Sequence, residues 1–505
     1  MQPQSRRSET PAMKTFTRAV ILAGSFLAIA SCGGGGSDGA NAPPTVGTQQ
    51  PATGRVSILI TDAPIDRFCQ IRATVESIDL LGGSSRANVF TGPETVDVLA
   101  LRNYTDAFAL NAEVPAGSFN KIRLTLSDLA LIECDAAGVP EPESQWDRPK
   151  LPGNGKLDLV PRGSVQVVGG EALVIELDLD MKKSLHLHQT GNGKWQFRPV
   201  VFVTVSPDET KLVRIFGTVR DLGSGGFELC PNGAVSSVDP DEDRRSNDSR
   251  ECVDVFTDGD TGIFDETGTR VGLDAIADGD LLTAIGFLGL HDGDDGDSRA
   301  DDLRLDAQVI ELGAAGTFAR LPGTVVSAPG NNDIFVFDTT PADDASNAID
   351  VLLQSGTRIF ALGSNEELTS AALQPGTTGA VDGVITDPAT SGEPLKSALI
   401  VLDQDTTPAH AITGATIATI PADDDADAAT RRLTVDVSGG PAGLCVKTDA
   451  STRYLRITES ASASETVEGT FADLAVSDEV DVFGSDDAEA GCVLADTIQE
   501  YATAP

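Results

Sequence analysis

Short segments in which apolar and polar residues alternate recur along this chain, and this period of two limits its possible folds most. Clear examples are the runs 71–76, 122–127 and 175–180. Because successive side chains of a strand point to opposite faces, such runs predict antiparallel strands with one buried face. The 51 glycines, the 27 prolines and an aromatic content of 5% favour many short strands and turns over long helices. We therefore expect an all-β protein.

The length of 505 residues is too great for a single core and predicts several domains. Between residues 55 and 206, five or more alternating segments occur without a helical period, which predicts a β-sandwich. After it, three degenerate copies of one pattern recur at a spacing of about 100 residues, typical of tandem domains rather than of a solenoid. The copies open at 215–219, 321–325 and 413–417, continue at 261–264, 357–360 and 452–455, and close at 307–310, 398–401 and 495–498.

Each copy combines short strands with a glycine where the first strand must bend, except that the third opening is less regular. This combination predicts three small β-barrels similar to an OB-fold. The expected order is a leader, a flexible Gly/Pro/Ser spacer, the sandwich and then the three barrels, at 1–31, 32–54, 55–206, 211–313, 317–405 and 412–501.

The leader predicts export. A basic region, Met13-Lys14 with Arg18, precedes an apolar run from Ala19 to Ala30, which is too short to span a bilayer as a helix. The run ends in Ile-Ala-Ser-Cys32, which resembles a bacterial lipobox, so we expect Cys32 to carry lipid. In a Gram-negative cell, Gly33 in place of aspartate favours the outer membrane. An ordinary secretory peptide with a chance cysteine is the alternative.

Six further cysteines fall as one pair in each of three segments: Cys69/Cys134, Cys230/Cys252 and Cys445/Cys492. The sequence permits many connectivities, and pairing within each segment is the simplest one in an oxidising compartment. None of these cysteines belongs to a Cys-x-x-Cys motif, so structural disulfides are favoured over a redox or zinc role.

The formal net charge of −41 argues against nucleic acid as a partner, because phosphates would be repelled. It argues equally against adsorption to anionic headgroups, which leaves the acyl chains on Cys32 as the expected membrane contact. Its simplest meaning is solubility.

Two segments carry a family resemblance. Thr61-Asp62-Ala63-Pro64 follows the first alternating run, and the later run from Leu177 to Ser184 precedes Gly193-Lys-Trp-Gln-Phe-Arg-Pro-Val200. Together they resemble the bacterial and archaeal domain of unknown function numbered 4382, a family without assigned chemistry. From the residues alone, Asp62-Ala63-Pro64 predicts a turn that ends the strand, with a ligand-binding role as the alternative.

The three later copies resemble, more weakly, the domain of unknown function numbered 5666. An OB shape alone implies no nucleic-acid binding. These copies lack the basic residues and stacking aromatics that such binding requires.

Calcium is the best candidate ligand. One acidic loop of the first barrel offers Asp292, Asp294 and Asp297 with glycines between them, and hard oxygen ligands at such spacing suit Ca²⁺. The loop fails the EF-hand template, because residue 303 is leucine where glutamate is needed. Solvated loop tips are the alternative, here and for the runs at 239–243 and 423–427.

Other candidates are weaker. His186 and His188 lie on one face of a predicted strand and offer two metal ligands without an identifiable third. Trp146 and Trp195 are candidate sugar platforms, with core packing favoured for Trp195. The sequence contains no metalloprotease, nucleophile-elbow or phosphate-loop motif.

We therefore expect a non-enzymatic, lipid-anchored envelope protein with a binding or structural display role, without a cofactor unless Ca²⁺ binds. Its expected partners are the membrane, through lipid, and an unidentified envelope protein or glycan. A calcium-dependent adhesin or carbohydrate-binding protein is the main alternative. An envelope hydrolase using two of the 77 acidic residues is a weaker one.

Overall fold

The computed structural model describes residues 53–63, 68–83, 85–103, 105–134, 140–161, 163–187, 195–206, 211–231, 252–291, 302–339, 348–385, 393–404, 409–421, 431–460, 462–487 and 491–503. Regular structure in these ranges is almost entirely β-strand, and α1 (Met181–Ser184) is a single helical turn. In the same ranges no helix has the length and apolar character needed to cross a membrane. The predicted all-β class is confirmed.

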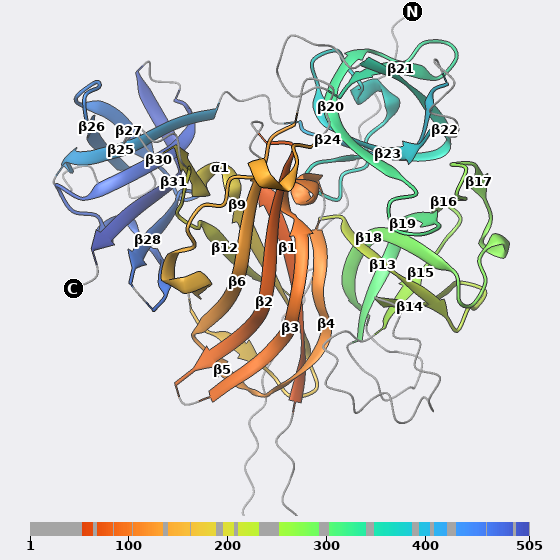
Figure 1. The fold of residues 1–505 in the computed structure, drawn as a ribbon, viewed down its shortest axis with the longest axis horizontal. Helices are drawn as coiled ribbons and strands as arrows, with labels where there is room; N and C mark the ends of the chain where they lie inside the picture. The colour runs from red at the N-terminus through yellow and green to blue at the C-terminus, as the bar shows by residue number, and fades with distance from the viewer. Residues whose placement is uncertain are drawn as a thin grey trace, which may run out of the picture. The chain divides into compact units, whose positions relative to one another are not determined.

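The first domain is a sandwich of two four-stranded layers (Figure 1). One layer has the order β12-β9-β1-β4 and the other the order β7-β6-β2-β3. The strands are β1 (Thr53–Ala63), β2 (Gln70–Gly82), β3 (Ser85–Asp97), β4 (Thr105–Pro115), β6 (Lys121–Ile132), β7 (Lys156–Val160), β9 (Ala172–Asp180) and β12 (Val201–Ser206). Two short ladders complete it: β5 (Gly117–Phe119) with β8 (Val165–Val167), and β10 (Leu185–Leu187) with β11 (Trp195–Phe197).

The alternating residues of the sequence build the core between these layers. Ile58 of β1, Ile71 of β2, Leu124 of β6 and Leu177 of β9 all belong to one buried cluster and are fully shielded from solvent. Each of these side chains gains about 1.5–3 kcal/mol from burial. The period of two therefore correctly identified the face of each strand that packs inward.

Three barrels follow the sandwich. The first contains β13 (Val213–Arg220), β14 (Gly226–Pro231), β15 (Val253–Phe256), β16 (Gly262–Phe264), β17 (Arg270–Val271), β18 (Leu281–His291) and β19 (Asp302–Leu312). The second contains β20 (Ala319–Ser327), β21 (Ile334–Asp338), β22 (Ala348–Ala361), β23 (Thr378–Val384) and β24 (Leu395–Leu402). The third contains β25 (Ala409–Thr419), β26 (Arg431–Val437), β27 (Leu444–Thr448), β28 (Arg453–Glu459), β29 (Ser464–Gly469), β30 (Glu479–Asp486) and β31 (Cys492–Thr503).

All three barrels close in the same order. The second is the closed ring β20-β21-β22-β24-β23, in which β22 and β24 are parallel. The first closes as β13-β14-β15-β19-β18 and the third as β25-β26-β27-β31-β30, each with the corresponding parallel pair. When the five ring strands are counted in chain order, a 3₁₀ turn lies between the third and the fourth strand of each barrel. These turns are Leu273–Ala275, Ser370–Ala372 and Phe471–Asp473. This topology is the OB-like barrel that the sequence predicted.

A glycine marks the same bulge in the fourth strand of every barrel. The register shifts at Gly286, Gly383 and Gly484. A Cβ atom there would approach a backbone carbonyl oxygen of the fifth strand to 2.2, 2.3 and 2.0 Å, respectively. Only glycine therefore fits without displacing the backbone of the neighbouring strand.

The opening glycine is kept in two barrels and replaced in the third. Gly217 pairs with Leu282, and Gly323 pairs with Gly379, four residues before the bulge glycine in each case. Ala415 takes this place in the third barrel, where it pairs with Val480. The ladder there shifts register between Ile412 and Ala415. The replacement of glycine by Ala415 and this register shift explain why the opening segment of the third copy looks irregular in the sequence.

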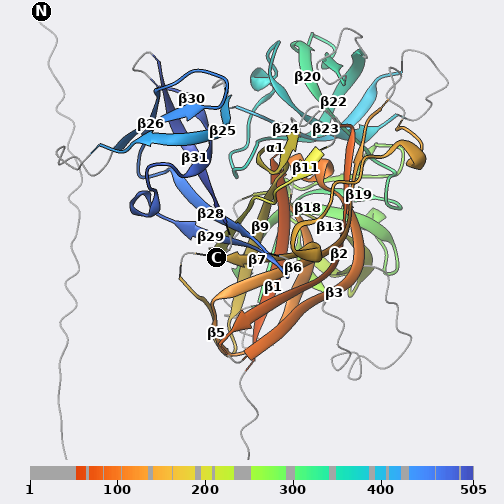
Figure 2. The ribbon, with the colours of Figure 1, turned by 60° about the vertical axis from the view of Figure 1, so that its left-hand side comes forward.

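Two of the barrels continue the sheets of the sandwich. β13 of the first barrel pairs in parallel with β4, and β29 of the third pairs in parallel with β7. Figure 2 shows β28 and β29 beside β7 and β6. The second barrel forms a sheet of its own.

Candidate functional site

The two motif segments of the sandwich lie on neighbouring strands. β1 and β9 are parallel, and Thr61, Asp62 and Ala63 pair with Asp178, Leu179 and Asp180. The sequence predicted a turn at 62–64, and this was wrong for Asp62 and Ala63, which are the last residues of β1. Pairing with β9 keeps the backbone extended through Ala63, while Pro64 lies outside the described residues.

The end of β9 is held by a small hydrogen-bonded turn. Asp180 caps α1 by accepting a bond of 2.9 Å from the backbone N–H of Lys183, and Lys183 Nζ lies 2.5 Å from the second carboxylate oxygen. The Ser184 hydroxyl donates to the carbonyl of Asp180 at 2.6 Å and accepts from the N–H of Val200 at 2.8 Å. These buried bonds join α1 to the segment that enters β12, so the motif residues have a clear structural role.

Acidic residues line the outer face of β9. Ile175, Leu177 and Leu179 point into the core, so Glu176, Asp178 and Asp180 lie on the opposite face. Lys211 Nζ lies 2.5 Å from a Glu176 oxygen, which pairs this carboxylate as Lys183 pairs Asp180. The result is a ladder of ion pairs rather than an open cluster of carboxylates.

Asp178 is the member of this ladder with a strongly perturbed pKa. Burial raises its pKa to about 6, with the opposing effect of Lys211 outweighed and the charges of Asp180 and Glu176 adding to the rise. Burial acts to lower the pKa of Lys183, but Asp180 and Asp496 raise it above its usual range. Lys183 therefore stays cationic at neutral pH.

The predicted metal ligands fall largely outside the described residues. Asp292, Asp294 and Asp297 lie in the gap 292–301, and His188 lies in the gap 188–194. His186 pairs with Gln196 through the backbone of β10 and β11. The acidic runs at 239–243 and 423–427 are also outside. The calcium and histidine sites remain predictions.

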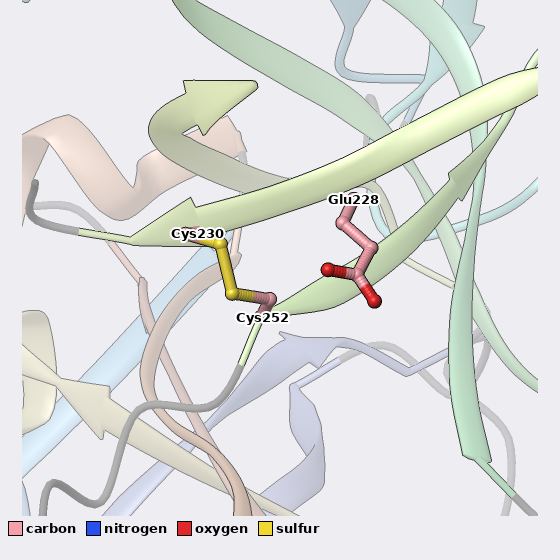
Figure 3. A group of neighbouring side chains, drawn as sticks. All are labelled: Glu228, Cys230 and Cys252. Atoms are coloured by element: carbon pink, nitrogen blue, oxygen red, sulfur yellow. A yellow bond between two sulfur atoms is a disulfide. The ribbon is translucent and has the colours of Figure 1, made fainter. Parts of the chain in front are cut away.

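Glu228, Cys230 and Cys252 form the one group of metal-ligand type found in the described part of the chain (Figure 3). Their side-chain ligand atoms lie within 4.8 Å of one another. The two sulfur atoms are, however, bonded to each other. Thiolates and not disulfide sulfurs are metal ligands, so this group is a disulfide beside a carboxylate.

The described residues contain three disulfides, each within one of the segments that the sequence delimited. They join Cys69 to Cys134 in the sandwich, Cys230 to Cys252 in the first barrel and Cys445 to Cys492 in the third. The loops they close span sequence separations of 65, 22 and 47 residues. Each bond stabilises its domain by about 2–4 kcal/mol, chiefly by restricting the unfolded chain.

The two tryptophans are both engaged within the protein. Trp195 packs against the sandwich core and meets the Phe68 ring edge-on at a centroid distance of 5.1 Å. The guanidinium groups of Arg72 and Arg148 lie 5.1 and 5.2 Å from the Trp146 ring, whose indole N–H donates to the carbonyl of Glu141. A sugar stacking on Trp146 would compete with these arginines.

Two buried carboxylates and two partly buried arginines meet between the first and second barrels, and no sequence pattern indicated this group. Arg214 lies 3.3 Å from Glu311, and Arg320 lies 3.4 Å from Asp382. Both carboxylate side chains are 1% exposed. Burial raises the pKa of Glu311, and the charge of Asp382 adds to the rise. The two arginines keep this junction from holding uncompensated negative charge.

A pocket of about 180 Å³, lined by both polar and apolar residues, lies where the sandwich meets the first barrel. Glu94, Phe108, Arg214, Phe216 and Thr283 are among its lining residues. It is small compared with the volumes typical of small-molecule sites.

One comparison gives a family for part of this architecture. Residues 53–199 match the family model described as Domain of unknown function (DUF4382). No curated protein and no solved structure matches the chain. The DUF4382 region therefore contains the paired motif segments, the α1 turn and all sandwich strands except β12. The resemblance of the barrels to domain 5666 remains a prediction.

Sequence reasoning missed one role of this region. In the sequence, Lys183 and Arg198 were recognised only as members of the family motif. In the structure, both contact residues of the third barrel. Their basic character in an acidic chain was the available signal.

Proposed function

We propose that this chain is an exported cell-envelope protein, tethered by lipid on Cys32, with a non-catalytic binding or structural role. The observation that carries the proposal is the set of three disulfides, one in the sandwich and one in each of two barrels. Such bonds form and persist in oxidising compartments outside the cytosol. They agree with the leader, whose apolar run ends at the lipobox-like Cys32.

The use of charged side chains in the described ranges supports a structural role over a catalytic one. Asp158 is held by Arg123 and Lys121, Asp180 by Lys183, and Glu176 by Lys211. A general acid or base must be able to reach a substrate and exchange a proton with it. Carboxylates fixed in ion pairs are better suited to holding strands and turns in register.

Lipidation is tested by metabolic labelling with an alkyne fatty acid, followed by membrane fractionation. The full-length protein should incorporate label and sediment with membranes, whereas Cys32→Ser should do neither. Ser37→Ala, a change in the spacer that leaves the lipobox-like segment intact, is the matched control and should behave as wild type. Label retained by Cys32→Ser would overturn the proposed anchor.

The non-catalytic part is tested separately with the purified protein on a panel of glycans, esters and peptides. No turnover above a heat-denatured control is expected. Turnover that disappears on changing one defined residue, with Asp178→Asn as the first candidate because of its raised pKa, would replace this proposal by an envelope hydrolase.

A further inference from the structure

The hairpin after the third strand differs in length among the three barrels. In the second barrel it is one bridge, Phe360 with Glu367, and in the first it is two pairs between β16 and β17. In the third it is the six-pair ladder of β28 and β29, from Tyr454–Gly469 to Glu459–Ser464. The third barrel thus carries the longest version of a shared element.

The outer strand of this long hairpin binds the edge of the sandwich. β29 pairs in parallel with β7 over four residues, from Ser464–Leu157 to Val467–Val160. The unpaired N–H and C=O groups at the edge of a sheet can form hydrogen bonds with a further strand. The extension of β28 and β29 therefore covers an edge that the sandwich alone would leave open.

We call the pairing of β7 with β29 the seam, and a lysine bridges the two domains there. Lys121 Nζ lies 3.2 Å from Asp158 of the sandwich and 2.5 Å from Glu465 of β29. Burial tends to raise the pKa of Asp158, but Arg123 and Lys121 lower it overall, so this carboxylate remains charged. The seam thus combines strand pairing with a charge-assisted hydrogen bond.

Apolar packing joins the same two domains beside β12. Val200 and Phe202 form one buried cluster with Leu455 and Ile457 of β28, and Tyr501 packs against it. The Arg453 guanidinium lies 4.0 Å from the Phe202 ring centroid. Val200 and Phe202 lie directly after the DUF4382 match, which ends at residue 199, so this apolar cluster adjoins that region.

The charges across this contact are complementary. The sandwich contributes Lys183, whose ammonium lies 5.6 Å from the Phe483 ring centroid, and Arg198, whose guanidinium lies 4.3 Å from the Tyr501 centroid. Arg198 also lies 3.7 Å from Glu479. Arg453 makes the reciprocal contact from the barrel to Phe202, so each domain presents cations to aromatic rings of the other. In a chain with a net charge of −41, the pairing of sandwich cations with barrel acids favours this contact over others.

We propose that the face formed by β7, α1 and β12 is a docking surface for an acidic β-barrel, and that its occupant is the third barrel of the same chain. This gives the closing motif of the DUF4382 region a role in recognising another domain. The proposal does not depend on the lipid anchor or on the absence of catalysis.

Cysteine trapping in the full-length protein tests the register. Val160 and Val467 are paired residues on β7 and β29, and both are partly buried. Val160→Cys with Val467→Cys should form a disulfide within one monomer, identified by mass spectrometry of the linked peptides. Val160→Cys with Thr416→Cys, which places the second thiol on an exposed position of β25, is the control and should not cross-link.

A charge swap tests the same contact without new covalent bonds. Lys121→Glu or Glu465→Lys alone should speed hydrogen exchange of the β29 amides by roughly fivefold, because like charges would then meet across the seam. The double variant restores opposite charges between positions 121 and 465 but leaves a glutamate beside Asp158, so its exchange rates should fall between those of Lys121→Glu and wild type. Glu143→Lys, which removes an exposed partner of Arg148 inside the sandwich, should leave these amides unchanged.

Three outcomes would overturn the proposal. They are no cross-link at Val160 and Val467, exchange rates unaffected by either single charge reversal, and a double variant no better than the single ones. A cross-link found only between two molecules would reassign the surface to the barrel of a second copy.

Discussion

The hydroxyl of Thr452 donates a hydrogen bond of 2.7 Å to the backbone carbonyl of Ala495. It also accepts one of 2.9 Å from the N–H of Asp449, so a single buried hydroxyl ties the turn after β27 to β31. Thr261 makes the equivalent bond to Ala307 at 2.9 Å, and Thr357 makes it to Ser397 at 2.7 Å. The threonine that opens the middle segment of each repeat therefore donates the same hydrogen bond, to a backbone carbonyl of the last ring strand, in all three barrels.

Replacing this hydroxyl should destabilise the third barrel without changing its shape. Thr452→Val preserves volume but leaves the N–H of Asp449 and the carbonyl of Ala495 without their partner. We expect a loss of about 1–3 kcal/mol in the free energy of unfolding, measured by denaturant titration. Thr419→Val, at an exposed threonine whose hydroxyl bonds the Thr434 hydroxyl, is the control and should cost less than about 0.5 kcal/mol. Equal effects of the two changes would refute the buried tie.

The repeats illustrate what could be predicted from the sequence. Their opening, middle and closing segments fall on equivalent strands of three barrels because each depends on local constraints: a glycine at a bend, a threonine at a turn, an alternating strand. The irregular third opening also has a local cause, since Ala415 stands where Gly217 and Gly323 stand in the other barrels.

The bulge glycine gives a second test of the barrel geometry. Gly484→Ala would place a Cβ atom 2.0 Å from the carbonyl oxygen of Leu494, which belongs to the backbone of β31 and has little room to move. We expect a cost of about 1–3 kcal/mol, the range typical of overpacking. Gly83→Ala meets nothing within 4 Å and should be close to neutral by the same measurement. A neutral Gly484→Ala would mean that the bulge adapts.

The contacts between domains could not be predicted in this way. Lys121 and Glu465 are separated by 344 residues, and neither lies in an unusual local pattern. The turn predicted at Asp62 failed for a related reason, because the parallel partner that extends β1 lies at Asp178–Asp180 and is distant in sequence. Local rules identify strands and turns, whereas pairing between distant strands decides where a strand ends and what covers it.

Calcium binding remains a prediction that a thermal melt can check. If Asp292, Asp294 and Asp297 hold Ca²⁺, the ion at about 100 times its Kd should stabilise the first barrel by roughly 2.7 kcal/mol. Mg²⁺ at the same concentration should not, because it requires a tighter geometry. The triple change of these residues to asparagine should abolish the Ca²⁺ shift. A shift that persists in this variant, or equal shifts with both ions, would remove the site.

The raised pKa of Asp178 predicts how stability depends on pH. Its pKa is about 6 in the folded protein, against 3.8 for an unperturbed aspartate, which represents the unfolded chain. Between these values the folded state binds the proton more tightly, so this group lowers stability as pH rises from about 4 to 6. At neutral pH the buried charge therefore costs stability, by roughly 2–3 kcal/mol.

Asp178→Asn removes that cost and should make the protein more stable than wild type at pH 7.5. The advantage should shrink as pH falls and disappear near pH 4, where the wild-type carboxyl is already neutral in the folded state. Denaturant titrations of both proteins across this range measure the difference directly, and other titrating groups cancel between them. A variant that is less stable at pH 7.5 would show instead that the charge of Asp178 is needed by Lys211 and Lys183, the cations that act to lower its pKa.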